Sequence, residues 1–224
     1  SISGTTSVCQ TGVAPDITFT NPMVLPVTVT YNINGGANTT INIGASTTAT
    51  VAAPTAVAGT YNYNLVNVFY QAVPTCTNGL AGTATVTVRP TPTATISGTT
   101  TVCQSGAAPN VTFTNPQALP ITVTYNINGG GNTTVNVGAS TTATVAAPTA
   151  VAGTFAYNLV SVDYQTAPTC TNGVAGSVTV TVRPTPTATI SGTTTVCLNA
   201  ASPNVTFTNP EPLAVTVTYN INGG

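Results

Sequence analysis

Apolar and polar residues alternate along much of the chain, which is the pattern of β-strands that bury one face and expose the other. The clearest example is the segment Ile121–Ile127, which alternates without interruption. It is followed by Asn128-Gly129, a pair that suits the positive φ angles of a type I′ turn, and by a return strand at 134–137. These segments predict a β-hairpin whose core-facing side chains are Ile121, Val123, Tyr125 and Ile127.

Five other segments of the same region are predicted to be strands, and no window shows the periodicity of a helix. In the longest of them the inward-facing phase changes near Leu159, which predicts a β-bulge there. With about seven strands and a turn signal roughly every 8 to 12 residues, the region is expected to form an all-β, immunoglobulin-like sandwich. The five segments are 93–97, 111–114, 142–145, 155–164 and 178–182.

The chain repeats itself at an interval of 94 residues, the distance from Ile2 to Ile96. The string Ile-Ser-Gly-Thr-Thr stands at 2–6, at 96–100 and again at 190–194. Copies this alike must share a fold. The sequence therefore predicts one sandwich over 1–91, a second over 92–185, and the N-terminal part of a third, truncated copy over 186–224.

Prolines mark the two junctions between copies, because Pro-Thr-Pro stands at 90–92 and at 184–186. Proline fixes φ and favours extended backbone. We therefore expect the sandwiches to lie end to end as a semi-rigid rod, each about 40 Å long if strands rise roughly 3.3 Å per residue.

Charge is almost absent, with 2 Lys or Arg, 3 Asp or Glu and no His among 224 residues. Arg89 and Arg183 cannot form the basic surface that nucleic acid or anionic lipid requires. Without His and Lys, and with Asp16, Asp163 and Glu211 scattered, the usual catalytic and metal-binding arrangements are also missing. The apolar runs are too short for a membrane-spanning helix. We expect a protein that is no enzyme, needs no cofactor and does not insert into membranes.

The cysteines predict disulfides in an oxidising compartment, because no Cys-x-x-Cys spacing accompanies them. Each complete copy has two, 67 positions apart. The preferred pairing lies within a copy, joining Cys9 to Cys76 and Cys103 to Cys170. The alternative joins neighbouring copies through Cys9 and Cys170, because the two positions of one copy fall at opposite ends of an immunoglobulin-like sandwich, beyond the roughly 7 Å that a disulfide allows between Cα atoms. Cys197 is left unpaired in either scheme.

Four strings of the second copy together resemble the PKD-like or immunoglobulin-like repeats of giant surface adhesins of Bacteroidota, especially flavobacteria. The resemblance covers the whole chain. It implies an extracellular, gliding-motility type of adhesin, exported by the type IX secretion system, in which many such repeats build a stalk or filament, and it implies no catalytic residue. The strings are Ile-Ser-Gly-Thr-Thr-Thr-Val-Cys at 96–103, Pro-Asn-Val-Thr-Phe-Thr-Asn-Pro at 109–116, Tyr-Asn-Ile-Asn-Gly-Gly at 125–130 and Val-Thr-Val-Thr-Val at 178–182.

Two classes of function follow. The first is structural, with tandem modules that extend a cell-surface adhesin and contact neighbouring repeats or identical chains of a filament. The second is a module that binds a glycan or another surface, for which the candidate side chains are Phe69, Tyr70, Asp163 and Tyr164. The change from Phe69 to Asp163 at equivalent positions argues against a ligand site common to both copies. Ice binding through Thr-x-Thr arrays requires a flat face, which a twisted sandwich does not provide.

Overall fold

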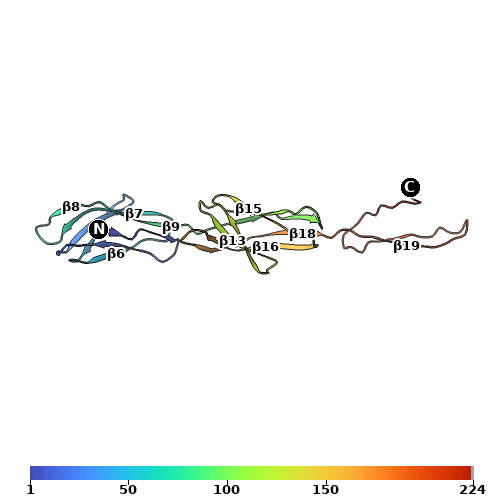
Figure 1. Ribbon diagram of the computed structural model, residues 1–224, viewed down its shortest axis with the longest axis horizontal. Coiled ribbons are helices and arrows are strands. Elements are labelled where there is room, and N and C mark those ends of the chain that lie inside the picture. Colours follow the sequence, from blue (N-terminus) through green and yellow to red (C-terminus); the bar gives the residue numbers. More distant parts are fainter. Residues whose placement is uncertain (223–224) are drawn as a thin grey trace.

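The computed structural model describes residues 1–222, and strands are the only regular secondary structure in that range. Two sandwiches follow one another along one line, and the segment after them continues in the same direction (Figure 1). The all-β, immunoglobulin-like prediction is confirmed by the order of the strands, which is the same in both sandwiches.

The first sandwich packs a three-stranded sheet, β1–β3–β6, against a sheet in the order β2–β9–β7–β4–β5. Strand β8 pairs with the last part of β7, beyond the part that pairs with β9. The strands are β1 (Ile2–Ser3), β2 (Thr6–Cys9), β3 (Asp16–Thr20), β4 (Val27–Ile33), β5 (Asn38–Ile43), β6 (Thr48–Ala52), β7 (Gly59–Tyr70), β8 (Thr77–Gly79) and β9 (Thr83–Arg89).

The second sandwich repeats this arrangement, with sheets β10–β12–β15 and β11–β18–β16–β13–β14 and with β17 paired to β16. Its strands are β10 (Thr95–Ser97), β11 (Thr100–Cys103), β12 (Asn110–Thr114), β13 (Ile121–Ile127), β14 (Asn132–Val137), β15 (Thr142–Ala146), β16 (Gly153–Tyr164), β17 (Thr171–Gly173) and β18 (Ser177–Arg183). Beyond it, β19 (Thr189–Ser191) and β20 (Thr206–Thr208) form an antiparallel pair.

The predicted hairpin and bulge are both present. Asn128 and Gly129 have φ of 54° and 72°, as a type I′ turn requires. Thr124 pairs with Ser161 and Tyr125 with Leu159, so one extra residue of β16 bulges between the two pairs. This bulge lets β16 bury residues of both phases, as its alternating pattern had indicated.

The core of each sandwich contains an aromatic row. Phe113 and Tyr125 have ring centroids 4.8 Å apart, and Tyr125 and Tyr157 have centroids 6.1 Å apart. Phe113 and Tyr157 are fully buried. Of the hairpin residues predicted to face the core, Ile121, Val123 and Tyr125 are buried, whereas Ile127 at the strand end is only partly covered.

Each sandwich has nine strands rather than about seven, because two short ones gave no clear pattern in the sequence. One of them, β2, runs parallel to β9, and its counterpart β11 runs parallel to β18. The parallel register places Cys9 opposite Arg89 at the end of the first sandwich. We call this end, which faces the second sandwich, the C-terminal pole of the first sandwich, and the opposite end its N-terminal pole. The corresponding ends of the second sandwich have the same names.

Candidate functional site: the joint between the sandwiches

The joint is closed by a disulfide between the two sandwiches. Cys9, at the C-terminal pole of the first sandwich, is bonded to Cys170, which lies just before β17 at the N-terminal pole of the second. The two Cα atoms are 5.5 Å apart. Only 3% of the Cys170 side chain is exposed, and Cys9 packs against the hydrophobic core of the second sandwich.

This bridge corrects the preferred prediction, which joined Cys9 to Cys76 and Cys103 to Cys170. Strand β7 begins beside the end of β9 and runs antiparallel to it, so its last residue and the following Cys76 lie at the N-terminal pole. Since β7 has 12 residues, the two poles are about 40 Å apart at roughly 3.3 Å per residue. That is far beyond the reach of a disulfide. The structure instead has the alternative pairing, and Cys76, Cys103 and Cys197 are exposed free thiols.

Arg89 provides a second, polar connection across the joint. Its Nη1 donates hydrogen bonds to the carbonyl oxygens of Thr166 at 2.6 Å and of Pro168 at 3.2 Å, and to the Thr166 hydroxyl at 3.2 Å. These acceptors belong to the loop that leads into Cys170. The guanidinium therefore holds the same loop that the disulfide anchors.

One part of the linker that follows Arg89 is packed into the joint, although Pro90, Thr91 and Thr93 are exposed. Pro92 is buried, and its carbonyl oxygen accepts a hydrogen bond from Asn172 Nδ2 at 2.9 Å. The Thr93 hydroxyl accepts a hydrogen bond from Gln117 Nε2 at 2.8 Å, and Ala94 is 8% exposed. The end of the junction, from Pro92 to Ala94, thus lies against the second sandwich, whereas the Thr91 N–H donates a hydrogen bond to Gln10 Oε1 of the first sandwich at 3.3 Å.

Two residues proposed as ligand contacts lie in or beside this joint. Tyr164 is 2% exposed, and its hydroxyl donates to Gln117 Oε1 at 3.2 Å. Burial raises the pKa of Tyr164 above its ordinary value, while the nearby Arg89 charge opposes that rise. Asp163 accepts a hydrogen bond from the Thr171 hydroxyl. In the second sandwich the polar groups of both side chains are therefore hydrogen-bonded to other residues of the protein.

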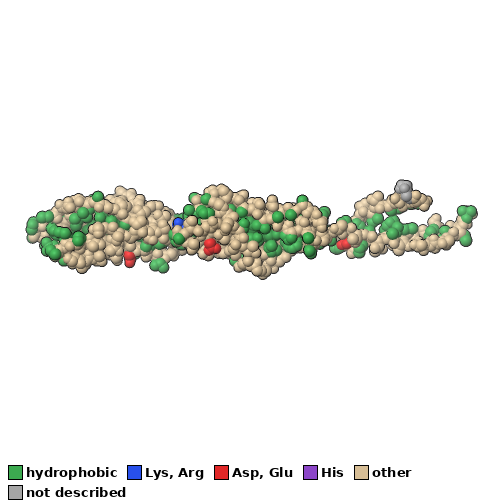
Figure 2. Space-filling view, in the orientation of Figure 1, with side chains coloured by type: hydrophobic (Ala, Val, Ile, Leu, Met, Phe, Trp, Pro, Cys, Tyr) green, Lys and Arg blue, Asp and Glu red, His purple; other side chains and the backbone are tan. Residues whose placement is uncertain are grey.

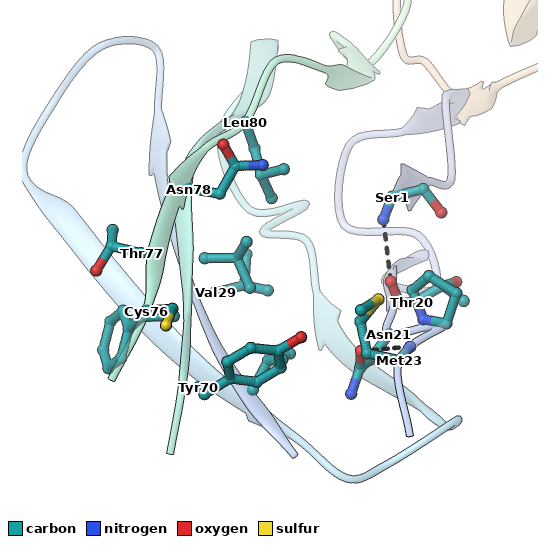
Figure 3. A pocket seen from close by; sticks show the side chains of 14 residues that line it. Ser1, Thr20, Asn21, Met23, Val29, Tyr70, Cys76, Thr77, Asn78 and Leu80 are labelled. Carbon is teal, nitrogen blue, oxygen red and sulfur yellow. Dashed lines mark hydrogen bonds between the residues drawn. The ribbon is translucent and has the colours of Figure 1, made fainter. Parts of the chain in front are cut away.

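The equivalent residues of the first sandwich line a cavity of about 310 Å³ at its N-terminal pole. Figure 3 shows Tyr70 and Cys76 on one side of this cavity, with Met23 and Ser1 on the other. Phe69 also belongs to its lining, and both aromatic side chains are partly exposed. The two pairs of predicted contact residues thus stand in different surroundings, because among the described residues a neighbouring sandwich packs against this pole of the second sandwich.

The sequence had singled out the cysteines as residues of the joint. It had not indicated the hydrogen bonds of Arg89 to the loop before Cys170, or the hydrogen bond between Asn172 and Pro92. An indication was available for Arg89, since an arginine stands at the same position before Pro-Thr-Pro in both copies.

Across residues 1–222 there is no group of three or more His, Cys, Asp or Glu side chains that could hold a metal ion. Within the same range, no helix has the length and apolar character needed to cross a bilayer.

No protein-family model matches the chain, and no curated protein matches it in sequence. Among solved structures, a Ca2+-stabilised, ice-binding adhesin of an Antarctic bacterium aligns over 83% of this chain at 20% identity and a TM-score of 0.39. The chain spans 49% of that adhesin's length. The D0–D1 domain of intimin aligns over 80% of this chain and 94% of its own, at 18% identity and a TM-score of 0.31.

Fibronectin(III)-like modules of CbhA from Clostridium thermocellum are also similar, at 15% identity and a TM-score of 0.32 over 82% of this chain and 94% of theirs. Similarities of this size do not define a shared function. The fold assignment therefore rests on the strand order and registers described above.

Proposed function

We propose that the chain is part of the stalk of an extracellular bacterial surface adhesin, a non-catalytic region whose modules, 1–91, 92–185 and the part-module 186–224, extend the protein away from the cell. The observation that carries this proposal is the joint, in which Cys9, Cys170 and Arg89 fix one sandwich onto the next. A flexible linker would be enough to connect two independent binding modules. A joint closed by a disulfide and by hydrogen bonds, with Pro92 of the linker buried in it, is what an extended rod needs.

The disulfide supports an extracellular location. A structural disulfide persists outside the reducing cytosol. Few charged side chains appear on the face shown in Figure 2, consistent with the five charged residues of the whole sequence. The resemblance to Bacteroidota repeats makes a gliding-motility type of adhesin, exported by the type IX secretion system, the form of stalk that we propose. Its partners would be neighbouring repeats and identical chains of a filament.

The stalk function is tested by changing the number of copies. The chain, or the chain with one or more additional 94-residue periods, is displayed on bacteria between a membrane anchor and a gold-labelled tip. Electron tomography then measures the distance from the label to the membrane. We expect this distance to grow linearly, by about 40 Å per added copy. A distance that does not depend on the number of copies would contradict the proposal.

The second candidate function, a module that binds a glycan or another surface, is favoured by the cavity beside Phe69 and Tyr70, since partly exposed aromatic rings suit the faces of sugars. It is tested by applying the purified chain to an array of glycans, with Tyr70→Ala as the comparison. Binding that Tyr70→Ala abolishes would support this candidate. Binding by neither protein would leave the stalk as the better account.

A further inference from the structure

The N-terminal pole of the first sandwich has the same local structure as the pole of the second sandwich that receives the joint. In both, a glutamine and a cysteine at equivalent positions of the loop before β8 or β17 make the same backbone hydrogen bonds. The loop of the first sandwich therefore has the same backbone hydrogen bonds as the loop that is docked in the second. The pairs are Gln71 N to Pro26 O (3.2 Å) and Gln165 N to Pro120 O (3.1 Å), and Cys76 N to Pro74 O (2.9 Å) and Cys170 N to Pro168 O (3.0 Å).

The two poles differ in what covers them. Cys170 and Tyr164 are 3% and 2% exposed, whereas Cys76 is exposed and Tyr70 is partly exposed. The residues that cover the second pole are Cys9 and the linker at 92–94. At the first pole the same position is the cavity, which Ser1, the equivalent of Thr95, helps to line.

The rim of the first pole is strongly apolar. Met23, Val24 and Val73 are 46%, 81% and 89% exposed, and hydrophobic side chains gather at this end of the molecule in Figure 2. No Lys, Arg, Asp or Glu side chain lines the cavity. An exposed apolar rim around a preformed cavity is typical of a surface that another protein segment covers.

We propose that this pole is an acceptor for the C-terminal pole of another repeat of the same kind. The Pro-Thr-Ala end of that repeat's linker fills the cavity, and its cysteine equivalent to Cys9 forms a disulfide with Cys76. Its arginine equivalent to Arg89 donates to the carbonyl oxygens of Ala72 and Pro74, which correspond to those of Thr166 and Pro168. The bridge between Cys9 and Cys170 is then one member of a series in which each repeat is bonded to the next.

The bond forms by exchange with a small-molecule disulfide such as glutathione disulfide. The thiolate of one cysteine attacks a glutathione sulfur, and the first glutathione leaves as a thiol. The second cysteine thiolate then attacks the mixed disulfide and releases the other glutathione. Two protein thiols are oxidised to one disulfide, and one glutathione disulfide is reduced to two thiols, which receive the two protons.

The experiment uses the full chain preceded by one further copy of residues 1–94, so that Ala94 of the added copy is joined to Ser1. The purified protein is equilibrated in a glutathione redox buffer and digested without reduction, and its disulfides are identified by mass spectrometry. We expect Cys9 of the added copy to be linked to Cys76 of the original chain. The bridge between Cys9 and Cys170 of the original chain should be retained. If Cys76 is alkylated as fully as in the 224-residue chain, with the original bridge intact, the proposal is overturned.

A second variant separates docking from bonding. With Cys9→Ser in the added copy no new bridge can form, but a docked repeat still covers the thiol of Cys76 in the original chain. We therefore expect alkylation of this Cys76 to be at least tenfold slower than in the chain without the added copy. An unchanged rate would overturn the proposed docking. So would protection of Cys76 by a mixture of soluble oligosaccharides and not by the added copy, because the occupant would then be a glycan.

The inference rests on the proposed stalk function for its role in the cell, but the two fail separately. The bridge is measured on purified protein, whereas the stalk is measured as a distance on cells. Repeats that bond to one another without increasing that distance would contradict the stalk alone.

Discussion

Cys9 and Cys170 are bonded although 161 positions separate them in the chain, and each lies in a different sandwich. Neither sandwich encloses a disulfide of its own among the described residues. The covalent reinforcement of this protein therefore lies between its modules, where packing contacts are fewest, and not inside them.

Removal of the bridge should lower stability much more than removal of a free thiol. For a closed loop of this length, the chain-entropy model gives about 5 kcal/mol. We expect Cys170→Ser to lower the free energy of unfolding by an amount of that order, measured by guanidinium denaturation under oxidising conditions. Cys103→Ser, at an exposed unbonded cysteine, is the control and should change it by less than about 0.5 kcal/mol. Equal effects of the two substitutions would contradict this account of the joint.

Arg89→Ala should make the bridge easier to reduce. Cys170 is buried and Cys9 is only partly exposed, so opening of the joint should speed the attack of a reductant, and the Arg89 hydrogen bonds oppose that opening. A loss of roughly 1.4 kcal/mol corresponds to about a tenfold faster reduction by dithiothreitol, followed by the appearance of titratable thiols. Arg183→Ala, at the equivalent exposed arginine, should leave the rate unchanged, and a rate that neither substitution alters would show that Arg89 does not hold the joint closed.

Stability should be lost in alkaline solution. Burial raises the pKa of Tyr125 and of Tyr157 above the ordinary value of a phenol, as it does for Tyr31, Tyr63 and Tyr164. The folded state therefore keeps these protons while the unfolded chain releases them, so the stabilisation is complete below about pH 10 and disappears as the pH rises through the folded-state values. Urea denaturation between pH 8 and pH 11.5 measures this. A free energy of unfolding that stays constant up to pH 11 would be inconsistent with it.

Tyr157→Phe should leave stability unchanged or raise it by up to about 1 kcal/mol. The Tyr157 hydroxyl is buried and has no hydrogen-bond partner among the described residues, as is also true of Tyr63 in the first sandwich. Removing an unpaired buried hydroxyl relieves a desolvation cost. The control is Tyr61→Phe, which removes a bond of 2.9 Å to the Val57 carbonyl oxygen and should be slightly destabilising. Thermal unfolding of both variants checks the prediction, and a clear loss with Tyr157→Phe would show that the hydroxyl is paired.

Gly98→Ala should be strongly destabilising. Gly98 has φ of 120°, and a Cβ there would lie 2.7 Å from the Asn110 carbonyl oxygen. The backbone strain and the contact together should cost about 2 kcal/mol or more. Gly129→Ala isolates the backbone term, because φ is 72° but no atom lies within 4 Å of its Cβ, and it should cost about 1 kcal/mol. If the two variants are equally stable, the close contact does not matter.

The sequence predicted the strands that combine regular alternation with a clear turn. Val123 and Tyr125 could be placed in the core because each side chain along a strand points to the opposite face from the one before it, and Asn128-Gly129 fixed the end of the strand. The short strand β11 was missed, since four residues supply too little alternation to be distinguished from a loop. Its pairing with β18 is parallel and joins residues 80 positions apart, such as Thr100 and Val180, so no local pattern contains it.

The joint could be predicted only in part for a related reason. Repetition at 94 residues shows that Cys9, Cys76, Cys103 and Cys170 occupy two kinds of position, but it does not say which copy supplies the partner. That choice depends on which pole each cysteine occupies, and hence on the direction of β2 and β7. Burial of Pro92 by the next sandwich is likewise a result of tertiary packing, since the segment itself is polar and proline-rich.

The bridge between Cys9 and Cys170 also decides how tension would travel along the molecule. A pulling force applied to the two ends follows the shortest covalent path, which leaves the backbone at Cys9, crosses to Cys170 and continues along β18. The residues between Cys9 and Cys170 do not carry this force. At roughly 3.6 Å per residue they would otherwise release on the order of 500–600 Å when unfolded. A tether made of such joints would keep its length under drag even while one of its sandwiches is open.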